Sequence, residues 1–274
     1  MDVTLNEKEK TLDAFQKLTY KNNSPDTLTF IWFHIWPNAY KNDRTAFSDQ
    51  MLKQGNTKFY FASKEERGYI NRLDFKVDGV SAKLEDHPQH IDIIKLVLPT
   101  PLPPGSTSVI TTPFHVKLPY NFSRGGWHKN SFQITQWYPK PAVYDAQGWH
   151  PMTYLNQSEF YSEFGDFDVR ITLPEDYVVA ATGALQNEEE KEWMRQRSIP
   201  AARRTTTVRA KPGTGPGNKA TNNLKKTATQ PPPAVATAQT KTLRFIQQNV
   251  HDFAFLLTKI SLFLLTVVNW VRGK

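Results

Sequence analysis

The sequence predicts an all-β fold, a β-sandwich or saddle of several antiparallel sheets, followed by a disordered basic linker and an apolar C-terminal helix. Short segments that alternate apolar and polar residues recur along residues 2–182, and a period of two is the pattern of half-buried strands. Gly, Pro and Asn separate these segments, as expected of turns. Aromatic residues make up 12% of the 274 residues, which suffices for a large core. Many short strands between turns are typical of a sandwich.

The first part of the chain alternates from its second residue. Residues 2–7 and 11–20 flank a charged turn and predict a hairpin. Residues 27–36 are rich in Thr, Ile, Phe and Trp and predict a strand that Pro37 ends. Residues 45–54 carry apolar side chains on one helical face and predict a short helix.

The middle of the chain predicts further strands. Residues 99–105 (PTPLPPG) predict a rigid turn, because proline restricts the backbone and lacks an N–H donor. The following strand should be interrupted at Pro113 for the same reason. The predicted strands are 69–77, 91–98, 107–118, 169–173 and 177–182, and residues 1–187 therefore predict one β-domain.

After residue 187 the composition changes. Residues 188–200 predict a short helix, acidic first and basic later, which suits the helix dipole. Residues 201–240 contain Ala, Thr, Pro, Lys and Arg with no aromatic or acidic residue, and predict a disordered linker. Residues 241–254 alternate again and predict a strand that closes the β-domain. Residues 255–274 predict an apolar tail.

The formal net charge of +8 belongs mainly to the last third of the chain. Residues 188–274 hold 15 of the 34 Lys and Arg but only 5 of the 26 Asp and Glu. The basic run 195–226 could contact nucleic acid phosphates, but it has no aromatic residues for stacking bases. We expect a solvated linker and no specific nucleic acid partner. The absence of cysteine excludes disulfides and thiolate metal sites.

The most distinctive stretch is residues 132–167, FQITQWYPKPAVYDAQGWHPMTYLNQSEFYSEFGDF. It concentrates aromatic side chains between prolines, which breaks regular structure and predicts extended chain and turns anchored on a core. Near its start, Gln136 is a polar residue among bulky neighbours. Its amide oxygen could accept a hydrogen bond from a ligand, or the side chain could be buried and paired with neighbouring backbone.

This stretch resembles the N-terminal β-domain of the aminopeptidase N family (membrane alanyl aminopeptidase-like gluzincins), in its bacterial branch. The resemblance rests on QWYPKPAVYD with the later GW, on EFYSEFGDFDVRITLP, on residues 27–47 and on TPFHVKLP at 112–119. It covers residues 2–187, and KTLRFIQQNVHDFA at 241–254 is similar to the segment that closes the same domain. It stops short of any catalytic domain.

The resemblance implies a substrate-cleft domain of a zinc-dependent aminopeptidase. In this family a glutamine or glutamate of the loop helps to hold the free amino terminus of a peptide substrate, and Gln136 is the residue that matches. The implied partners are the catalytic domain of the same polypeptide and a peptide substrate, and the implied cofactor of the complete enzyme is zinc. The alternative from another class is a noncatalytic β-sandwich binding module with a C-terminal membrane anchor.

No catalytic or metal-binding residue is predicted in this chain. The family's zinc site needs His-Glu-x-x-His on one helix, and no two histidines here are four residues apart. His87 and His90 are three apart, but Pro88 disfavours a helix, so we expect a solvated loop. The family's Gly-x-Met-Glu-Asn motif is also absent. The chain alone should be an inactive fragment without bound cofactor.

The apolar tail admits three interpretations. Back-translating Phe255–Phe263 and reading two bases later gives Phe-Ala-Asp-Lys-Asn-Phe-Ile-Val, the continuation that the resemblance leads us to expect. The first hypothesis is therefore a reading-frame slip that ends a longer enzyme. The second is a transmembrane helix over Phe253–Val271, since about 20 apolar residues span a bilayer, although Lys259 would cost about 2.5–3.5 kcal/mol at its centre. The third is a tail that aggregates or packs on the sandwich.

The start of the chain leaves the localisation open. No basic n-region and no apolar h-region follow Met1, so the sequence shows no secretory signal. The family that it resembles is usually extracytoplasmic, either periplasmic or membrane-associated. Met1 directly precedes a predicted strand, which fits an internal methionine or a trimmed start.

Overall fold

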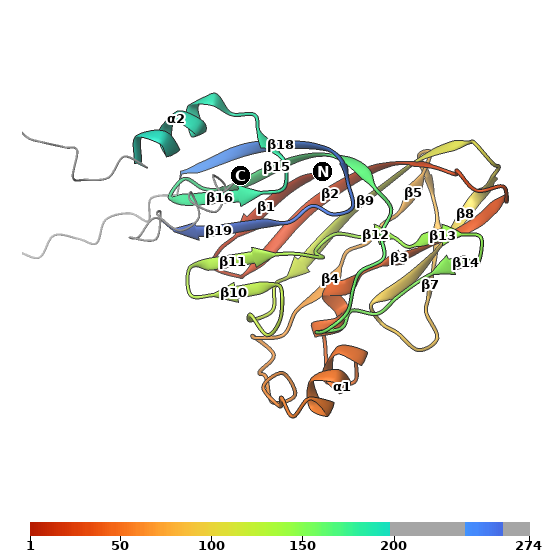
Figure 1. Ribbon diagram of the computed structural model, residues 1–274, viewed down its shortest axis with the longest axis horizontal. Coiled ribbons are helices and arrows are strands. Elements are labelled where there is room, and N and C mark those ends of the chain that lie inside the picture. The colour runs from red at the N-terminus through yellow and green to blue at the C-terminus, as the bar shows by residue number, and fades with distance from the viewer. Residues whose placement is uncertain (198–238, 260–274) are drawn as a thin grey trace, which may run out of the picture.

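The computed structural model describes residues 1–197 and 239–259 of the chain and is mostly β (Figure 1). The all-β prediction is confirmed. The strands are β1 Asp2–Asn6, β2 Thr11–Lys21, β3 Leu28–His34, β4 Tyr69–Asn71, β5 Lys76–Val77, β6 Val80–Ser81, β7 Lys83–Asp86, β8 Ile93–Leu102, β9 Thr107–Lys117, β10 Gly126–His128, β11 Ser131–Ile134, β12 Lys140–Pro141, β13 Val143–Asp145, β14 Gly148–His150, β15 Gly165–Pro174, β16 Tyr177–Ala181, β17 Ala184–Leu185, β18 Thr240–Val250 and β19 Phe255–Lys259. The helices are the 3₁₀ helix η1 Trp36–Tyr40, α1 Ala46–Lys53 and α2 Glu188–Arg197.

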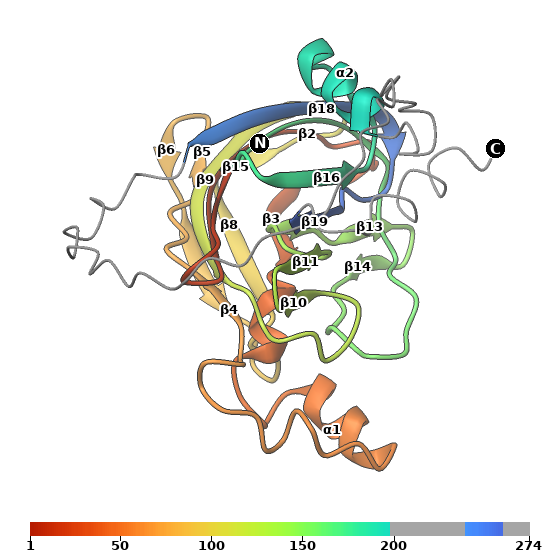
Figure 2. The same ribbon diagram turned by 90° about the vertical axis from the view of Figure 1, so that its left-hand side faces the viewer.

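The largest sheet has the order β17-β18-β15-β1-β2-β9-β5-β6, and β4 also pairs with β9. The predicted first hairpin is confirmed as β1 and β2, which pair in register from Asp2 opposite Phe15 to Asn6 opposite Thr11. Its first strand also runs parallel to β15, far along the chain. Figure 2 shows this sheet arching over the strands β16, β19 and β11.

Two expectations fail along this sheet. Residues 69–77 form two short strands, because the chain turns out of the sheet at Arg72, whose φ is +58°. Strand β9 is not interrupted at Pro113, which lies opposite Phe15 of β2. Pro113 faces the break between β4 and β5, where β9 has no second neighbour, so its missing N–H costs no ladder hydrogen bond there.

The other sheets are smaller. Their orders are β10-β11-β19-β16, β12-β3-β8-β7 and β13-β14. The predicted rigid turn at 99–105 begins later than expected, since β8 continues through Pro99 and Pro101 to Leu102. A register shift between Leu28 and Phe30 of β3 leaves both prolines exposed, outside the paired ladder.

Two groups of buried side chains form the core. The larger group lies between the large sheet and the smaller ones and includes Trp137, Phe253 and Phe255. The second is an aromatic cluster beside α1, which is the predicted short helix. Thr45 caps the N-terminus of α1, where its hydroxyl accepts from the Ser48 N–H at 3.3 Å. This cluster contains Trp36, Ala39, Tyr40, Phe47, Met51, Phe59 and Tyr154.

Residues 240–259 contribute one strand to the largest sheet and one to the sheet β10-β11-β19-β16. Strand β18 lies between β15 and β17, and β19 lies between β11 and β16. The helix expected from residue 255 is therefore wrong for residues 255–259, which form a strand. Phe255 and Leu257 are buried while Leu256 is exposed, so the period is two and the segment satisfies its backbone through both neighbouring strands.

The predicted transmembrane helix over Phe253–Val271 is also wrong for its first seven residues, which are not helical. Residues 253–259 pack into the β-domain, and the Lys259 ammonium contacts Glu7 at 2.7 Å and Asp176 at 3.0 Å. Among the described residues no helix is both long and apolar enough to cross a membrane. Three predictions lie wholly or partly outside the described ranges: the remainder of the helix over Phe253–Val271, most of the linker 201–240, and the last residues of the helix 188–200.

Candidate functional site

Gln136 lies in the short connection between β11 and β12, at the start of the aromatic stretch. Its φ is +47°, in the left-handed region that non-glycine residues seldom adopt. Trp137 and Tyr138 follow it and are both buried, so the backbone must turn sharply for two large side chains to enter the core. Such a conformation costs free energy and persists because the surrounding contacts fix it.

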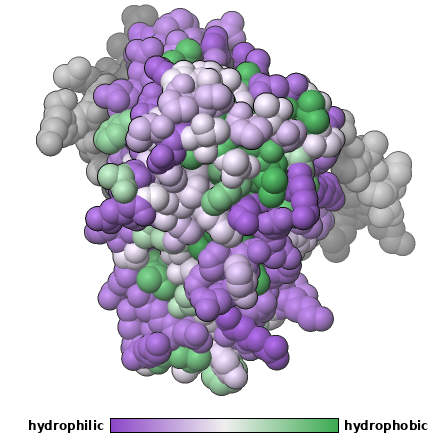
Figure 3. Space-filling view, turned by 90° about the vertical axis from the view of Figure 1, so that its right-hand side faces the viewer, coloured by the Kyte–Doolittle hydropathy of each residue, from purple (hydrophilic) through white to green (hydrophobic). Residues whose placement is uncertain are grey.

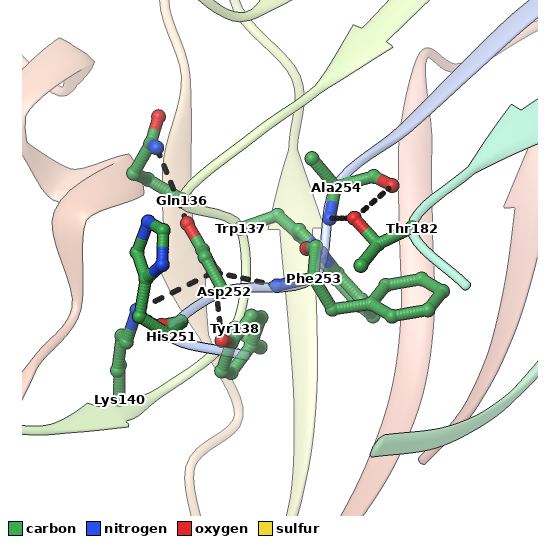
Figure 4. Close-up of polar contacts among 9 residues, drawn as sticks. All are labelled: Gln136, Trp137, Tyr138, Lys140, Thr182, His251, Asp252, Phe253 and Ala254. Carbon is green, nitrogen blue, oxygen red and sulfur yellow. Dashed lines mark hydrogen bonds and ion pairs between the residues drawn. The ribbon is translucent and has the colours of Figure 1, made fainter. Parts of the chain in front are cut away.

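The contacts that fix this segment converge on Asp252, in the loop between β18 and β19. The Gln136 amide nitrogen donates to Asp252 Oδ2 at 3.3 Å, and the Tyr138 hydroxyl donates to Oδ1 at 2.8 Å (Figure 4). The Phe253 N–H donates to the same Oδ1 at 2.9 Å. Burial is the main cause that holds the pKa of Tyr138 well above its usual value, and the Asp252 carboxylate adds to it. The hydroxyl therefore keeps the proton that it donates.

Lys140 adds a buried cation to the cluster. Its ammonium lies 3.5 Å from Asp252 Oδ1 and donates to the His251 carbonyl oxygen. Burial lowers the pKa of Lys140, and the nearby Asp252 carboxylate acts in the opposite direction. The ion pair and the carbonyl contact therefore compensate for removing the charge from water.

Two further hydrogen bonds hold the same loop. The Trp137 indole N–H donates to the Phe253 carbonyl oxygen at 3.0 Å. The Ala254 N–H donates to the Thr182 hydroxyl at 3.1 Å, and that hydroxyl donates back to the Ala254 carbonyl at 3.3 Å. The segments 136–140 and 251–254, more than 100 residues apart, thus form one hydrogen-bonded unit (Figure 4).

The Gln136 amide has one free end. Its oxygen is buried and accepts no hydrogen bond from the described residues. Gln136 also lines a small cavity, together with Tyr40 and Thr135, and the Thr135 hydroxyl is likewise buried without a hydrogen-bond partner among the described residues. The space suits about one or two groups of the size of a water molecule. It has room for an ammonium group but not for a peptide.

The histidines do not assemble a metal site in the part of the chain that the structure describes. The rings of His87 and His90 stack at 5.0 Å, and His87 Nδ1 accepts from the N–H groups of Gln89 and His90. Throughout residues 1–197 and 239–259, no group of three or more metal-ligating side chains is found. His150 pairs instead with Asp145 at 2.7 Å, and His115 with Asp13 at 2.7 Å.

Another buried pair of titratable groups anchors the neighbouring loop. His34 Nε2 accepts from the Met152 N–H at 3.0 Å, and Asp92 Oδ2 accepts from the Tyr154 N–H at 2.7 Å. Burial lowers the pKa of His34 to about 3, with the nearby Lys140 charge adding to the effect. Burial raises the pKa of Asp92 to about 6.

Sequence reasoning identified Gln136 but missed its partners. Asp252, Lys140 and Tyr138 lie within the segments that carry the resemblance, but nothing in those segments assigned them to Gln136, because their contacts join segments that are neighbours only in the folded chain. A lysine between two prolines inside an apolar stretch was the one available signal that a charge would be buried.

The surface offers no comparable feature on the face shown in Figure 3. Hydrophobic residues there form small separate patches among hydrophilic ones. Scattered patches of this kind are ordinary on protein surfaces and do not define a docking site. The Gln136–Asp252 unit is therefore the feature on which we base the functional argument.

Comparison with known proteins gives similar structures but no assigned family. No protein-family model and no curated protein matches the chain. An M1 zinc metallopeptidase from Deinococcus radiodurans has a similar structure, with 15% identity, a TM-score of 0.44, and coverage of 94% of this chain and 40% of that one. A two-domain M1 zinc metallopeptidase mutant bound to L-arginine is similar at 14% identity and a TM-score of 0.44, with the same coverage. The chain thus spans 40% of the length of these proteins.

Proposed function

We propose that this chain is the substrate-cleft domain of a zinc-dependent aminopeptidase and that Gln136 holds the amino end of the peptide. The observation that carries the proposal is the orientation of the Gln136 amide, whose nitrogen is paired with Asp252 and whose oxygen is unpaired. The motif resemblance of residues 132–167 supports the same role for this residue.

The chemistry fits an ammonium ligand. An ammonium group only donates hydrogen bonds, and the amide oxygen of Gln136 only accepts them. The Lys140 ammonium balances the charge of the Asp252 carboxylate, so the group that would meet a cationic ligand is the unpaired amide oxygen of Gln136. The adjoining cavity has room for an ammonium group alone, so the remainder of the peptide would lie outside it.

In this proposal the hydrolytic chemistry is not assigned to the described residues. They form no group that fits a zinc ion, and the sequence has no His-Glu-x-x-His motif. In the proposed enzyme the zinc and its activated water belong to a catalytic domain beyond this chain. The role of this chain is to bind and orient the substrate.

The proposed binding can be tested with a matched pair of peptides. Titration of the full chain with a tripeptide that has a free amino terminus should shift the NMR resonances of the Gln136 side chain. The same tripeptide with an acetylated amino terminus should not. Affinities for the two peptides, measured from backbone amide shifts, should become equal in Gln136→Ala and should still differ in Gln133→Ala, at a neighbouring exposed position that lines the same cavity. Equal binding of both peptides would contradict the proposal.

A second measurement tests whether zinc binding and hydrolysis belong to this chain. The purified chain should hydrolyse no aminoacyl substrate and should retain no stoichiometric zinc after dialysis. Turnover together with one zinc per chain would show that the catalytic centre lies in this chain, and the proposed role as a separate substrate-cleft domain would then be wrong.

A further inference from the structure

Asp252 is placed so that it determines which end of the Gln136 amide is free. Three donors face its Oδ1 atom: the Tyr138 hydroxyl, the Phe253 N–H and the Lys140 ammonium. Its Oδ2 atom is left to the amide nitrogen of Gln136. A carboxylate offers only acceptors, so reversing the amide would bring two oxygens together and lose a hydrogen bond to a charged group.

We propose that Asp252 is a positioning residue that holds Gln136 with its amide oxygen free to accept from a ligand. The identity of that ligand as a peptide ammonium rests on the proposed function. The positioning itself rests only on the geometry of the cluster. Asp252 is a suitable support because Trp137 and Thr182 hydrogen-bond to its loop. Asp166 also holds the adjoining end of β18, where it accepts from the Asn249 N–H at 2.9 Å.

The arrangement makes Asp252→Asn an informative substitution. The three donors require an oxygen at the Oδ1 position, so the new amide nitrogen must take the place of Oδ2 and face Gln136. Two amide nitrogens would then oppose each other. Gln136 should reverse its amide, pair its oxygen with the new N–H, and present its own nitrogen where the free oxygen was. A site that accepts a hydrogen bond becomes one that donates.

The experiment follows the Gln136 side-chain amide by ¹H–¹⁵N NMR in the full chain, with and without the free-amine and acetylated tripeptides. In the unmodified chain, the amide protons of Gln136 should show nuclear Overhauser contacts to the Asp252 methylene group. Asp252→Asn should shift both amide proton resonances and should weaken binding of the free-amine peptide by about tenfold or more, the usual loss for one hydrogen bond to a charged group.

Two control variants separate positioning from general destabilisation. Tyr138→Phe removes another donor to Asp252 and leaves the Gln136 side chain unchanged. Asp166→Asn changes a contact at the end of β18, next to the loop. Both should leave the amide resonances of Gln136 in place. If Asp252→Asn fails to fold, the Overhauser contacts of the unmodified chain decide, since their absence refutes the orientation.

The outcomes distinguish the two proposals. Unchanged Gln136 resonances in folded Asp252→Asn would overturn the positioning role, whatever the peptides do. Shifted resonances in a protein that never distinguished the two peptides would uphold the positioning role and refute the peptide-binding function. Shifted resonances together with loss of free-amine binding would support both.

Discussion

The indole N–H of Trp137 donates to the carbonyl oxygen of Phe253 at 3.0 Å, across 116 positions of sequence. Both side chains are fully buried and belong to the same core. This single contact joins the aromatic stretch to the loop between β18 and β19, and it links the conformation beside Gln136 to residues that follow the long basic stretch.

Replacing Trp137 should therefore destabilise the fold through a lost hydrogen bond as well as lost packing. Trp137→Phe leaves the Phe253 carbonyl buried without its donor, which costs about 1–3 kcal/mol, in addition to the smaller ring. Urea unfolding measures the change. Trp149→Phe is the control, because Trp149 is half-buried and its indole donates no hydrogen bond within the described residues, and its effect should be clearly smaller.

Strand β19 gives a direct test of the C-terminal fold. Leu257 is 1% exposed and its neighbour Leu256 is 44% exposed, on opposite faces of the same strand. Leu257→Ala should cost about 2–5 kcal/mol of unfolding free energy, as for other buried leucines, and Leu256→Ala should cost little. Thermal or urea unfolding of both variants checks this. Equal effects would contradict a strand with one buried face.

His34 predicts a specific dependence of stability on pH. Its pKa is about 3 in the folded chain against 6.5 in the unfolded chain, so the unfolded state binds the proton first as the pH falls. From pH 7 to pH 5 this group alone should lower stability by roughly 2 kcal/mol. His34→Gln should remove that part of the loss.

The comparison with the variant is needed because Asp92 acts in the opposite direction. Its folded pKa of about 6 lies above its unfolded value of 3.8, so it adds stability at low pH and loses it as the pH rises through 6. Urea unfolding of His34→Gln and of the unmodified chain at pH 7 and pH 5 isolates the histidine. A difference between the two that does not change with pH would contradict its buried, neutral state.

Two glycines with similar φ values should respond differently to alanine. Gly183 has a φ of +91°, and a Cβ there would lie 2.5 Å from the Ile246 carbonyl oxygen. Gly148 has a φ of +97° with open space around it. Gly148→Ala should cost about 1–2 kcal/mol for the backbone conformation alone, and Gly183→Ala should cost several kcal/mol more because the backbone of β18 must move. Differential scanning calorimetry of the two variants compares them.

The elements that the sequence predicts well are those with local patterns. Alternation in residues 2–20 gives the first hairpin, and the apolar face after Thr45 gives α1. The predictions fail where pairing with a strand distant in sequence determines the local structure. Pro113 stays in a strand because β9 lacks a second partner at that position, and Phe255–Lys259 forms a strand because β11 and β16 pair with it on both sides.

The candidate site divides in the same way. The motif around Gln136 indicated an amide that could accept a hydrogen bond, but it gave no information about which end of the amide would be free. Asp252 decides this, and it lies 116 positions away. Residue types and their spacing report a hydrogen-bonding capacity, whereas the partner that uses it comes from the packing of separate strands.

The sequence by itself determined that this chain would form many short strands around an aromatic core and that it would have neither cysteine chemistry nor the paired histidines of a zinc helix. Only the tertiary structure decided that β1 would lie parallel to β15, that the last described residues would complete a sheet, and that Asp252 would orient Gln136. The physical reason is the distance along the chain over which each kind of interaction acts. Side-chain periodicity and turn chemistry act over a few residues, while strand pairing and buried hydrogen bonds depend on groups brought together from distant parts of the chain.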